Sequence, residues 1–122
     1  MARKRVLVVD DDAAIRAIFA ALLEEEGYRV TGVGDAVSAI GLLSEAGRWD
    51  LLITDNRMPG MSGTELVDEI AGQYPELPVI ILSGLPLAAV PAGYAEGRVQ
   101  YLMKPVRPDR LLLFVRTMLN EA

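Results

Sequence analysis

The sequence predicts an α/β protein built on a parallel β-sheet, and two observations carry this prediction. Short apolar runs recur along the 122 residues, separated by segments in which apolar residues have helical spacing, which is the pattern of βα units. Four of these runs, residues 6–9, 51–54, 79–82 and 101–103, lead directly into Asp10, Asp55, Ser83 and Lys104. Parallel strands end at one edge of a sheet, so we expect these side chains to gather there. The length fits one domain, residues 1–122.

The amino-terminal half predicts two strand–helix pairs. After the first strand, a helix is indicated by apolar residues at helical spacing, with Gly27 as its stop. These apolar residues are Ile15, Ile18, Phe19, Leu22 and Leu23. A second strand of weaker pattern covers residues 28–33. Asp35 can then cap a second helix. Its apolar residues are Val37, Ile40 and Leu43.

The carboxyl-terminal half continues the alternation. Ser62 and Glu65 fit a capping box that opens a third helix. The apolar residues of this helix are Leu66, Val67 and Ile70. A fifth strand is expected over residues 99–103, and Pro108 fits the first turn of the last helix. The stripe of that helix is Leu111, Phe114, Val115, Met118 and Leu119. The intervening stretch is rich in glycine and proline, so we expect only a short or frayed fourth helix near residues 87–95.

Composition excludes several kinds of function. The net charge of −5 and pI near 4.7 argue against nucleic acid or an anionic membrane as a direct partner. The chain contains no cysteine, which rules out disulfides and suits a cytoplasmic location. It contains no histidine, so it cannot itself carry a phosphohistidine. No apolar run reaches the roughly 18 residues that a membrane span needs.

The polar residues at the strand ends predict phosphoryl chemistry. Asp10, Asp11 and Asp55 would repel one another at one sheet edge, and bound Mg²⁺ or Mn²⁺ would remove the conflict. The Lys104 ammonium offers a point charge for a phosphate, and the Ser83 hydroxyl can donate to a phosphoryl oxygen. One aspartate then remains as a nucleophile that forms an aspartyl phosphate. The neighbouring Asp12 is expected to cap the first helix.

Four segments of the chain resemble the receiver domain of two-component response regulators, which includes the chemotaxis regulators. They are residues 8–11, 55–63, 82–84 and 101–105. The resemblance implies a flavodoxin-like, doubly wound fold: a five-stranded parallel sheet in the order 2-1-3-4-5 with helices on both faces. It also implies that the domain is not an enzyme acting on a separate substrate, because it catalyses only its own phosphorylation and dephosphorylation.

The resemblance also assigns the metal and the phosphoryl acceptor. Asp55 would accept a phosphoryl group from the phosphohistidine of a sensor histidine kinase or a histidine phosphotransfer protein. Asp11 and Asp55 would bind Mg²⁺ directly, with the backbone carbonyl of Arg57 as a third ligand. Asp10 would act mainly through a metal-bound water.

The remaining implied roles concern the phosphoryl oxygens and the switch. Ser83 and Lys104 would hold the phosphoryl oxygens, and the Lys104–Pro105 peptide bond would be cis. Ser83 would move toward the phosphoryl group while Tyr101 occupies the space left behind. The alternative is that Tyr101 has only a structural role, as a half-buried strand tyrosine whose hydroxyl contacts water.

Some residues depart from the family pattern, and other functions also fit the sequence. Arg57 and Leu85 stand at positions that tune autodephosphorylation in the family, and their side chains predict a long-lived phospho-aspartate. One alternative is a receiver-like interaction module that works without phosphorylation. Another is a haloacid-dehalogenase-type phosphatase, whose opening motif resembles Asp10 and Asp12. The sequence leaves open a stand-alone regulator, part of a hybrid kinase or part of a larger regulator, and it names no downstream partner.

Overall fold

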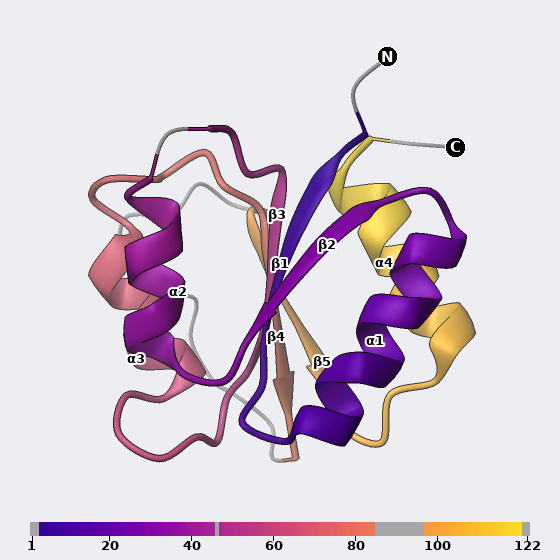
Figure 1. The fold of residues 1–122 in the computed structure, drawn as a ribbon, viewed down its shortest axis with the longest axis horizontal. Coiled ribbons are helices and arrows are strands. Elements are labelled where there is room, and N and C mark those ends of the chain that lie inside the picture. The colour runs from indigo at the N-terminus through magenta and orange to yellow at the C-terminus, as the bar shows by residue number, and fades with distance from the viewer. Residues whose placement is uncertain (1–2, 46, 85–96, 121–122) are drawn as a thin grey trace.

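The computed structural model describes residues 3–45, 47–84 and 97–120. They contain one sheet of five parallel strands in the order β2-β1-β3-β4-β5 (Figure 1). The strands are β1 (Arg5–Val9), β2 (Arg29–Val33), β3 (Leu51–Asp55), β4 (Val79–Ser83) and β5 (Val99–Met103). The predicted strand order is confirmed, including the weakly patterned second strand.

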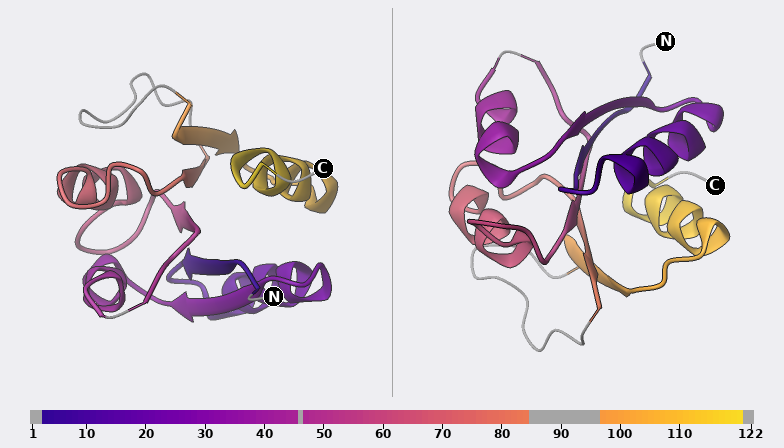
Figure 2. Two further views of the ribbon diagram at one scale, coloured as in Figure 1. Left: turned by 90° about the horizontal axis from the view of Figure 1, so that it is seen from above. Right: turned by 60° about the horizontal axis from the view of Figure 1, so that its bottom comes forward.

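The helices cover both faces of the sheet in two pairs. Figure 2 shows α1 and α4 on one side of the strands, and α2 and α3 on the other. The helices are α1 (Ala13–Glu25), α2 (Ala36–Leu43), α3 (Gly63–Ile70) and α4 (Pro108–Met118). The helix predicted near residues 87–95 lies outside the described residues. None of the helices found in the described ranges is long and apolar enough to cross a bilayer.

Strand residues divide alternately between two cores. In β1, Leu7 and Val9 belong to the core beneath α2 and α3, whereas Val6 and Val8 belong to the core beneath α1 and α4. This follows from the two-residue period of a strand. All five residues of β3 and of β4 are buried, because a parallel sheet with helices on both faces excludes water from its central strands.

The predicted helix boundaries are confirmed by their hydrogen bonds. The Asp12 side chain accepts from the backbone N–H groups of Ala14 and Ile15, at 2.9 and 3.1 Å. Gly27 follows α1 with a φ of 96°, a left-handed conformation that glycine adopts without steric cost. Pro108 is the first residue of α4.

Two further caps lower the pKa of a carboxyl group. The Asp35 carboxylate accepts from the Ser38 backbone N–H at 2.7 Å, and this bond lowers the pKa of Asp35. Ser62 and Glu65 form the predicted capping box, with bonds of 3.0 and 3.1 Å. The N–H of Ser62 likewise lowers the pKa of Glu65.

Two of the apolar residues whose spacing indicated α1 and α2 are exposed. Ile18 is 63% exposed on α1, and Val37 is 73% exposed on α2. The α2 helix buries Ala36, Ala39 and Leu43. Small alanine side chains on the inner face allow this short helix to approach the sheet, and Val37 then points away from it because successive helix residues differ by about 100° in direction.

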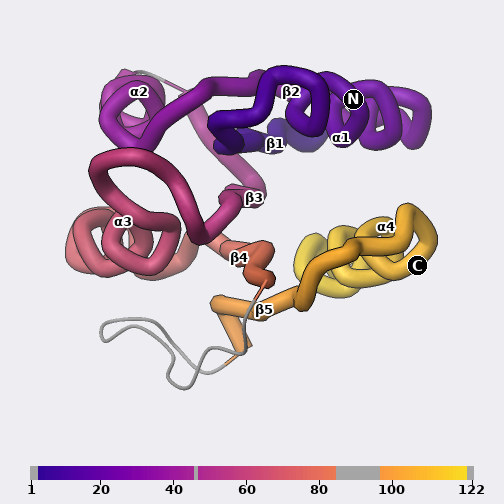
Figure 3. The backbone as a smooth tube through the Cα atoms, turned by 90° about the horizontal axis from the view of Figure 1, so that it is seen from below, coloured from indigo at the N-terminus to yellow at the C-terminus, as the bar shows by residue number. Residues whose placement is uncertain are grey.

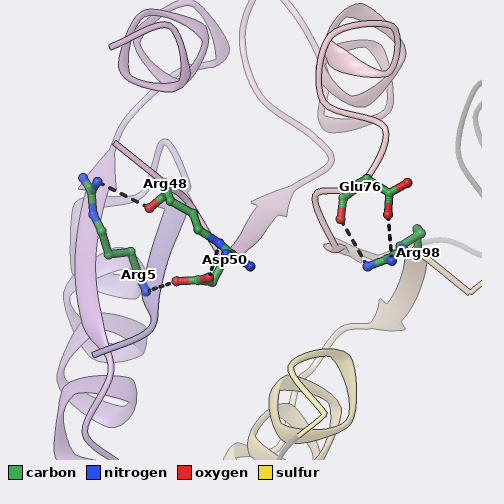
Figure 4. Close-up of polar contacts among 5 residues, drawn as sticks. All are labelled: Arg5, Arg48, Asp50, Glu76 and Arg98. Carbon is green, nitrogen blue, oxygen red and sulfur yellow. Dashed lines mark hydrogen bonds and ion pairs between the residues drawn. The ribbon is translucent and has the colours of Figure 1, made fainter. Parts of the chain in front are cut away.

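The amino-terminal edge of the sheet, called the amino edge below, has oppositely charged side chains in pairs (Figure 4). The Arg5 backbone N–H donates to Asp50 Oδ2 at 2.8 Å, and Arg48 Nε lies 3.2 Å from Asp50 Oδ1. The Arg5 guanidinium stacks 4.0 Å above the centre of the Trp49 ring. These contacts join the start of β1 to the segment that enters β3.

A second pair on the amino edge joins the segments that enter β4 and β5. Arg98 Nη2 lies 2.9 Å from Glu76 Oε2, and Arg98 Nη1 donates to the Glu76 carbonyl at 3.2 Å (Figure 4). Both side chains are substantially exposed. Solvent screening therefore limits the stabilisation that this pair supplies.

Candidate functional site

The polar residues predicted from the strand ends converge at the opposite edge of the sheet, called the carboxyl edge below. Figure 3 looks onto this edge, toward which the arrows of β4 and β5 point in Figure 1. Asp55 pairs in register with Leu82, and Ser83 pairs with Met103. The register therefore brings the ends of β3, β4 and β5 together.

Three carboxylates form a cluster at the carboxyl edge. Asp10, Asp11 and Asp55 each offer one carboxylate oxygen, and these oxygens lie within 4.8 Å of one another. Asp10 and Asp55 are buried, at 2% and 4% exposed, whereas Asp11 is exposed. The sequence prediction that these three residues meet is confirmed.

Asp10 occupies an environment that disfavours its negative charge. Burial raises the pKa of its carboxyl group, and the nearby carboxylate of Asp55 raises it further. The Asp12 backbone N–H partly offsets this effect by donating to Asp10 Oδ1 at 2.9 Å. Protein groups alone thus compensate the negative charge of this carboxylate incompletely.

Two oxygens of the cluster lack hydrogen-bond donors. Across the described residues, Asp10 Oδ2 and Asp55 Oδ1 are the buried side-chain atoms without a hydrogen-bond partner. The Lys104 ammonium forms an ion pair with Asp55 Oδ1. One lysine does not neutralise three clustered carboxylates. Buried oxygens with free lone pairs fit a hard divalent cation such as Mg²⁺.

The backbone of Asp55 is held by the loop that follows β3. The Thr64 N–H and hydroxyl both donate to Asn56 Oδ1, at 2.9 and 2.7 Å. The Gly63 N–H donates to the Asn56 carbonyl at 2.9 Å. A Cβ atom on Gly63 would stand 2.5 Å from the Asp55 carbonyl oxygen. The start of α3 therefore packs directly against the backbone of the central aspartate.

Sequence reasoning assigned no role to Asn56 or Gly63. Both lie in the segment after β3 that resembles the receiver pattern. Gly63 is the first residue of α3 and follows the capping serine. Nothing in the local sequence signals that its missing side chain makes room for the backbone of Asp55.

Ser83 and Lys104 lie side by side at the ends of β4 and β5. The Lys104 backbone N–H donates to the Ser83 carbonyl at 2.8 Å. Ser83 is buried, and the Lys104 side chain is partly exposed. The Lys104–Pro105 peptide bond is cis, as the resemblance implied.

Tyr101 and Arg57 occupy contrasting positions. Tyr101 on β5 lies opposite Ile81 on β4. It is half-buried and packs against the core beneath α2 and α3. Burial raises the pKa of its hydroxyl, and the charge of Asp68 raises it further. Arg57 is exposed in the loop after β3. The predicted tuning residue Leu85 lies outside the described residues.

Comparison with known proteins decides the family. The family model of the response regulator receiver domain matches residues 6–116. The chain belongs to this family. This membership confirms the resemblance drawn from the sequence and removes the support for a haloacid-dehalogenase-type phosphatase.

Individual receiver relatives agree in sequence and in fold. The two-component response regulator ORR24 of Oryza sativa subsp. indica is 42% identical over 109 residues, which cover 88% of this chain and 17% of ORR24. A CheY-like receiver domain protein from Methanospirillum hungatei has 31% identity and a TM-score of 0.86, covering 98% of this chain and 95% of that one. The chain thus spans about a sixth of ORR24 and nearly all of the CheY-like structure.

A further similar structure was solved with a bound metal ion. The response regulator protein TrrA from Thermotoga maritima, in complex with Mg(2+)-BeF, has 30% identity and a TM-score of 0.77. The likeness covers 94% of this chain and 98% of that chain. Its bound groups are a property of that protein.

Proposed function

We propose that this receiver domain, residues 1–122, accepts a phosphoryl group on Asp55 in a Mg²⁺-dependent reaction. The observation that carries the proposal is the buried Asp55 carboxylate, which lies in a three-carboxylate cluster and contacts the Lys104 ammonium. Of the two cluster oxygens without a hydrogen bond, Asp55 Oδ1 has the Lys104 ion pair and Asp10 Oδ2 has no partner. A cation would neutralise this cluster, and a negatively charged phosphoryl group could then approach Asp55.

The donor is a phosphohistidine of a sensor histidine kinase or a histidine phosphotransfer protein. An Asp55 carboxylate oxygen forms a bond to phosphorus while the phosphorus–nitrogen bond of the donor breaks, and the imidazole nitrogen keeps that electron pair. The 122 residues contain no histidine. The donor therefore lies in another chain or in a part of the protein beyond these residues.

The metal is held by oxygens at the carboxyl edge. Asp11, Asp55 and the backbone carbonyl of Arg57 are the proposed direct ligands, and Asp10 acts through a metal-bound water. Mg²⁺ supplies neutralising charge to both the carboxylates and the phosphoryl oxygens. Mn²⁺ would serve in its place, since it favours the same oxygen ligands. The TrrA structure, solved with Mg(2+)-BeF, supports this choice by analogy.

The phosphorylated state is read through Ser83, Lys104 and Tyr101. The hydroxyl of Ser83 and the ammonium of Lys104 bind phosphoryl oxygens, which carry a charge of roughly −1.5 to −2. Ser83 and Tyr101 together form the switch, and the changed surface controls a partner or an attached domain in the cytoplasm. Domain activity is confined to its own phosphorylation and dephosphorylation, and the Arg57 side chain favours a long-lived phospho-aspartate.

Incubation with Mg²⁺ and acetyl phosphate, followed by intact mass measurement, tests the proposal. We expect a phosphate adduct on the unmodified chain and none on Asp55→Asn, which keeps the shape of the side chain without its nucleophilic charge. Asp50→Asn on the amino edge is the matched control and should keep the adduct. Absence of an adduct with every small-molecule donor and kinase would favour a module that works without phosphorylation.

A further inference from the structure

Arg16 contacts the backbone of the carboxylate cluster at Asp10, although no motif in the sequence singles it out. It lies on α1, and its Nη1 donates to the backbone carbonyl oxygen of Asp10 at 2.6 Å. A guanidinium is always charged, so this is a charge-assisted hydrogen bond, stronger than one between neutral groups. Arg16 therefore fixes the peptide unit that joins Asp10 to Asp11.

Two glycines on β2 and just after it provide the path for the Arg16 side chain. A Cβ atom on Gly32 would lie 3.0 Å from both Cγ and Cδ of Arg16, and one on Gly34 would lie 3.4 Å from Nη1. Neither glycine has a positive φ. The backbone conformation therefore does not require glycine at these positions. A side chain at position 32 would instead crowd the Arg16 stem, whereas the contact at position 34 would be an ordinary one.

The contacts of Asp10 show what this arrangement achieves. Its N–H donates to the Val33 carbonyl at 3.1 Å, its carbonyl accepts from Arg16, and its Oδ1 accepts from the Asp12 N–H. Only Oδ2 has no hydrogen-bond partner. Three polar atoms of one residue are thus fixed by protein groups, and the fourth is left for a ligand.

We propose that Arg16 is a positioning residue that holds the Asp10–Asp11 corner in its cation-binding arrangement. This inference rests on the proposed function of the carboxyl edge. It makes a prediction opposite in sign to simple electrostatics. A positive charge near a cation site repels the cation, so removal of Arg16 would tighten metal binding if charge alone mattered. Loss of positioning would weaken it.

Mn²⁺ binding to the full chain, measured from the electron paramagnetic resonance signal of the free ion, separates these outcomes. We expect Arg16→Ala to raise the Mn²⁺ dissociation constant about tenfold, a typical loss when a supporting contact of a metal site is removed. Arg16→Lys keeps a charged donor and should recover part of the affinity. Arg29→Ala is the matched control, because Arg29 is exposed at the start of β2, and it should leave the dissociation constant unchanged.

A double-mutant cycle tests whether the glycine path acts through Arg16. Gly32→Ala should weaken Mn²⁺ binding several-fold in the unmodified chain, because the added methyl group displaces the arginine stem. In the Arg16→Ala background the same change should have little effect, since the crowded neighbour is gone. Urea unfolding without metal, followed by circular dichroism, establishes that each variant is folded.

Unchanged or tighter Mn²⁺ binding by Arg16→Ala would overturn the positioning role, and additive losses in the cycle would overturn the part that the glycine path plays in it. A second readout is the Mg²⁺ concentration that gives half-maximal labelling by acetyl phosphate. It should rise in Arg16→Ala, while the labelling rate at saturating Mg²⁺ stays close to that of the unmodified chain. If the unmodified chain binds Mn²⁺ but is never labelled, the proposed function fails and the role of Arg16 in metal binding stands.

Discussion

The two edges of the sheet treat charge in opposite ways. On the amino edge, Asp50 pairs with Arg48 and Glu76 pairs with Arg98. On the carboxyl edge, three carboxylates gather, Lys104 forms an ion pair with Asp55, and the buried Asp10 Oδ2 has no hydrogen-bond partner. The first arrangement is complete without a ligand, and the second is not. The difference indicates that charges on the amino edge join segments, whereas charges on the carboxyl edge are arranged for an added cation.

Repulsion between the clustered carboxylates explains why the backbone of the carboxyl edge is held by so many contacts. Like charges in a buried site favour separation or protonation. Here the corner after β1 is held by Arg16, Asp12 and Val33. The end of β3 is held by the close approach of Gly63. A site that must stay assembled before its ligand arrives is thus supported by the surrounding backbone.

Crowding the carboxyl edge is expected to cause the largest change in the free energy of unfolding. Gly63→Ala would place a methyl carbon against the Asp55 carbonyl oxygen, where backbone rather than a flexible side chain must give way. We expect a loss of about 2 kcal/mol in the free energy of unfolding, measured by urea denaturation. Gly41→Ala on α2 is the matched control; its Cβ meets nothing within 4 Å, and it should gain about 0.5 to 1 kcal/mol. Equal stability of the two variants would contradict the close packing at Asp55.

A smaller effect is expected from opening the amino edge. Asp50→Ala removes the acceptor of the Arg5 N–H and the partner of Arg48. The Asp50 side chain is only 11% exposed, so we expect the free energy of unfolding to fall by about 1.5 kcal/mol, as for a hydrogen bond to a charged group. Labelling by acetyl phosphate should stay unchanged. A parallel loss of labelling would show that the two edges are coupled.

The smallest expected change is a gain in stability rather than a loss. Asp10→Asn removes a buried charge, and we expect the metal-free protein to gain about 1 kcal/mol of stability, as when a functional site is relieved of strain. The same variant should lose the stabilisation that added Mg²⁺ gives the unmodified chain. Urea denaturation with and without Mg²⁺ measures both changes.

The pH dependence of this gain follows from the raised pKa of Asp10. In the folded chain the pKa lies above the ordinary value of 3.8, so the folded state binds the proton more tightly than the unfolded state. Stability from this group is therefore fully present below pH 3.8 and is lost as the pH rises through the folded-state pKa. The advantage of Asp10→Asn should accordingly be small at acidic pH and grow toward neutrality. A gain that shrinks as the pH rises would refute this explanation.

The sequence predicted the fold and the meeting of the three carboxylates because both depend on strand ends and helix caps. Four of the five strand ends are marked by a polar residue after an apolar run, and the caps at Asp12, Asp35 and Ser62 are local patterns. Their hydrogen bonds involve residues two or three positions along the chain. Short-range chemistry of this kind is readable from the order of residues alone.

The contributions of Arg16 and Gly63 were not predictable in the same way. The Arg16 side chain on α1 passes over Gly32 of β2, and Gly63 approaches the end of β3 eight residues earlier. The exposure of Ile18 and Val37 was not predictable either, because helical spacing identifies an apolar face without showing how much of it the sheet covers. These features depend on how closely elements pack in three dimensions.

Trp49 gives the amino edge an optical signal of its own. It is the single tryptophan in the chain, its ring lies under the Arg5 guanidinium, and its indole N–H donates to the Leu42 carbonyl at 3.3 Å. Five residues lie between it and Asp55, and these six steps along the chain span up to about 20 Å at the rise of a parallel strand. Tryptophan emission should therefore follow the loosening of the Arg5 contact on unfolding while remaining insensitive to direct quenching at the acidic cluster. Folding and site loading can then be recorded in one sample by independent spectroscopic channels.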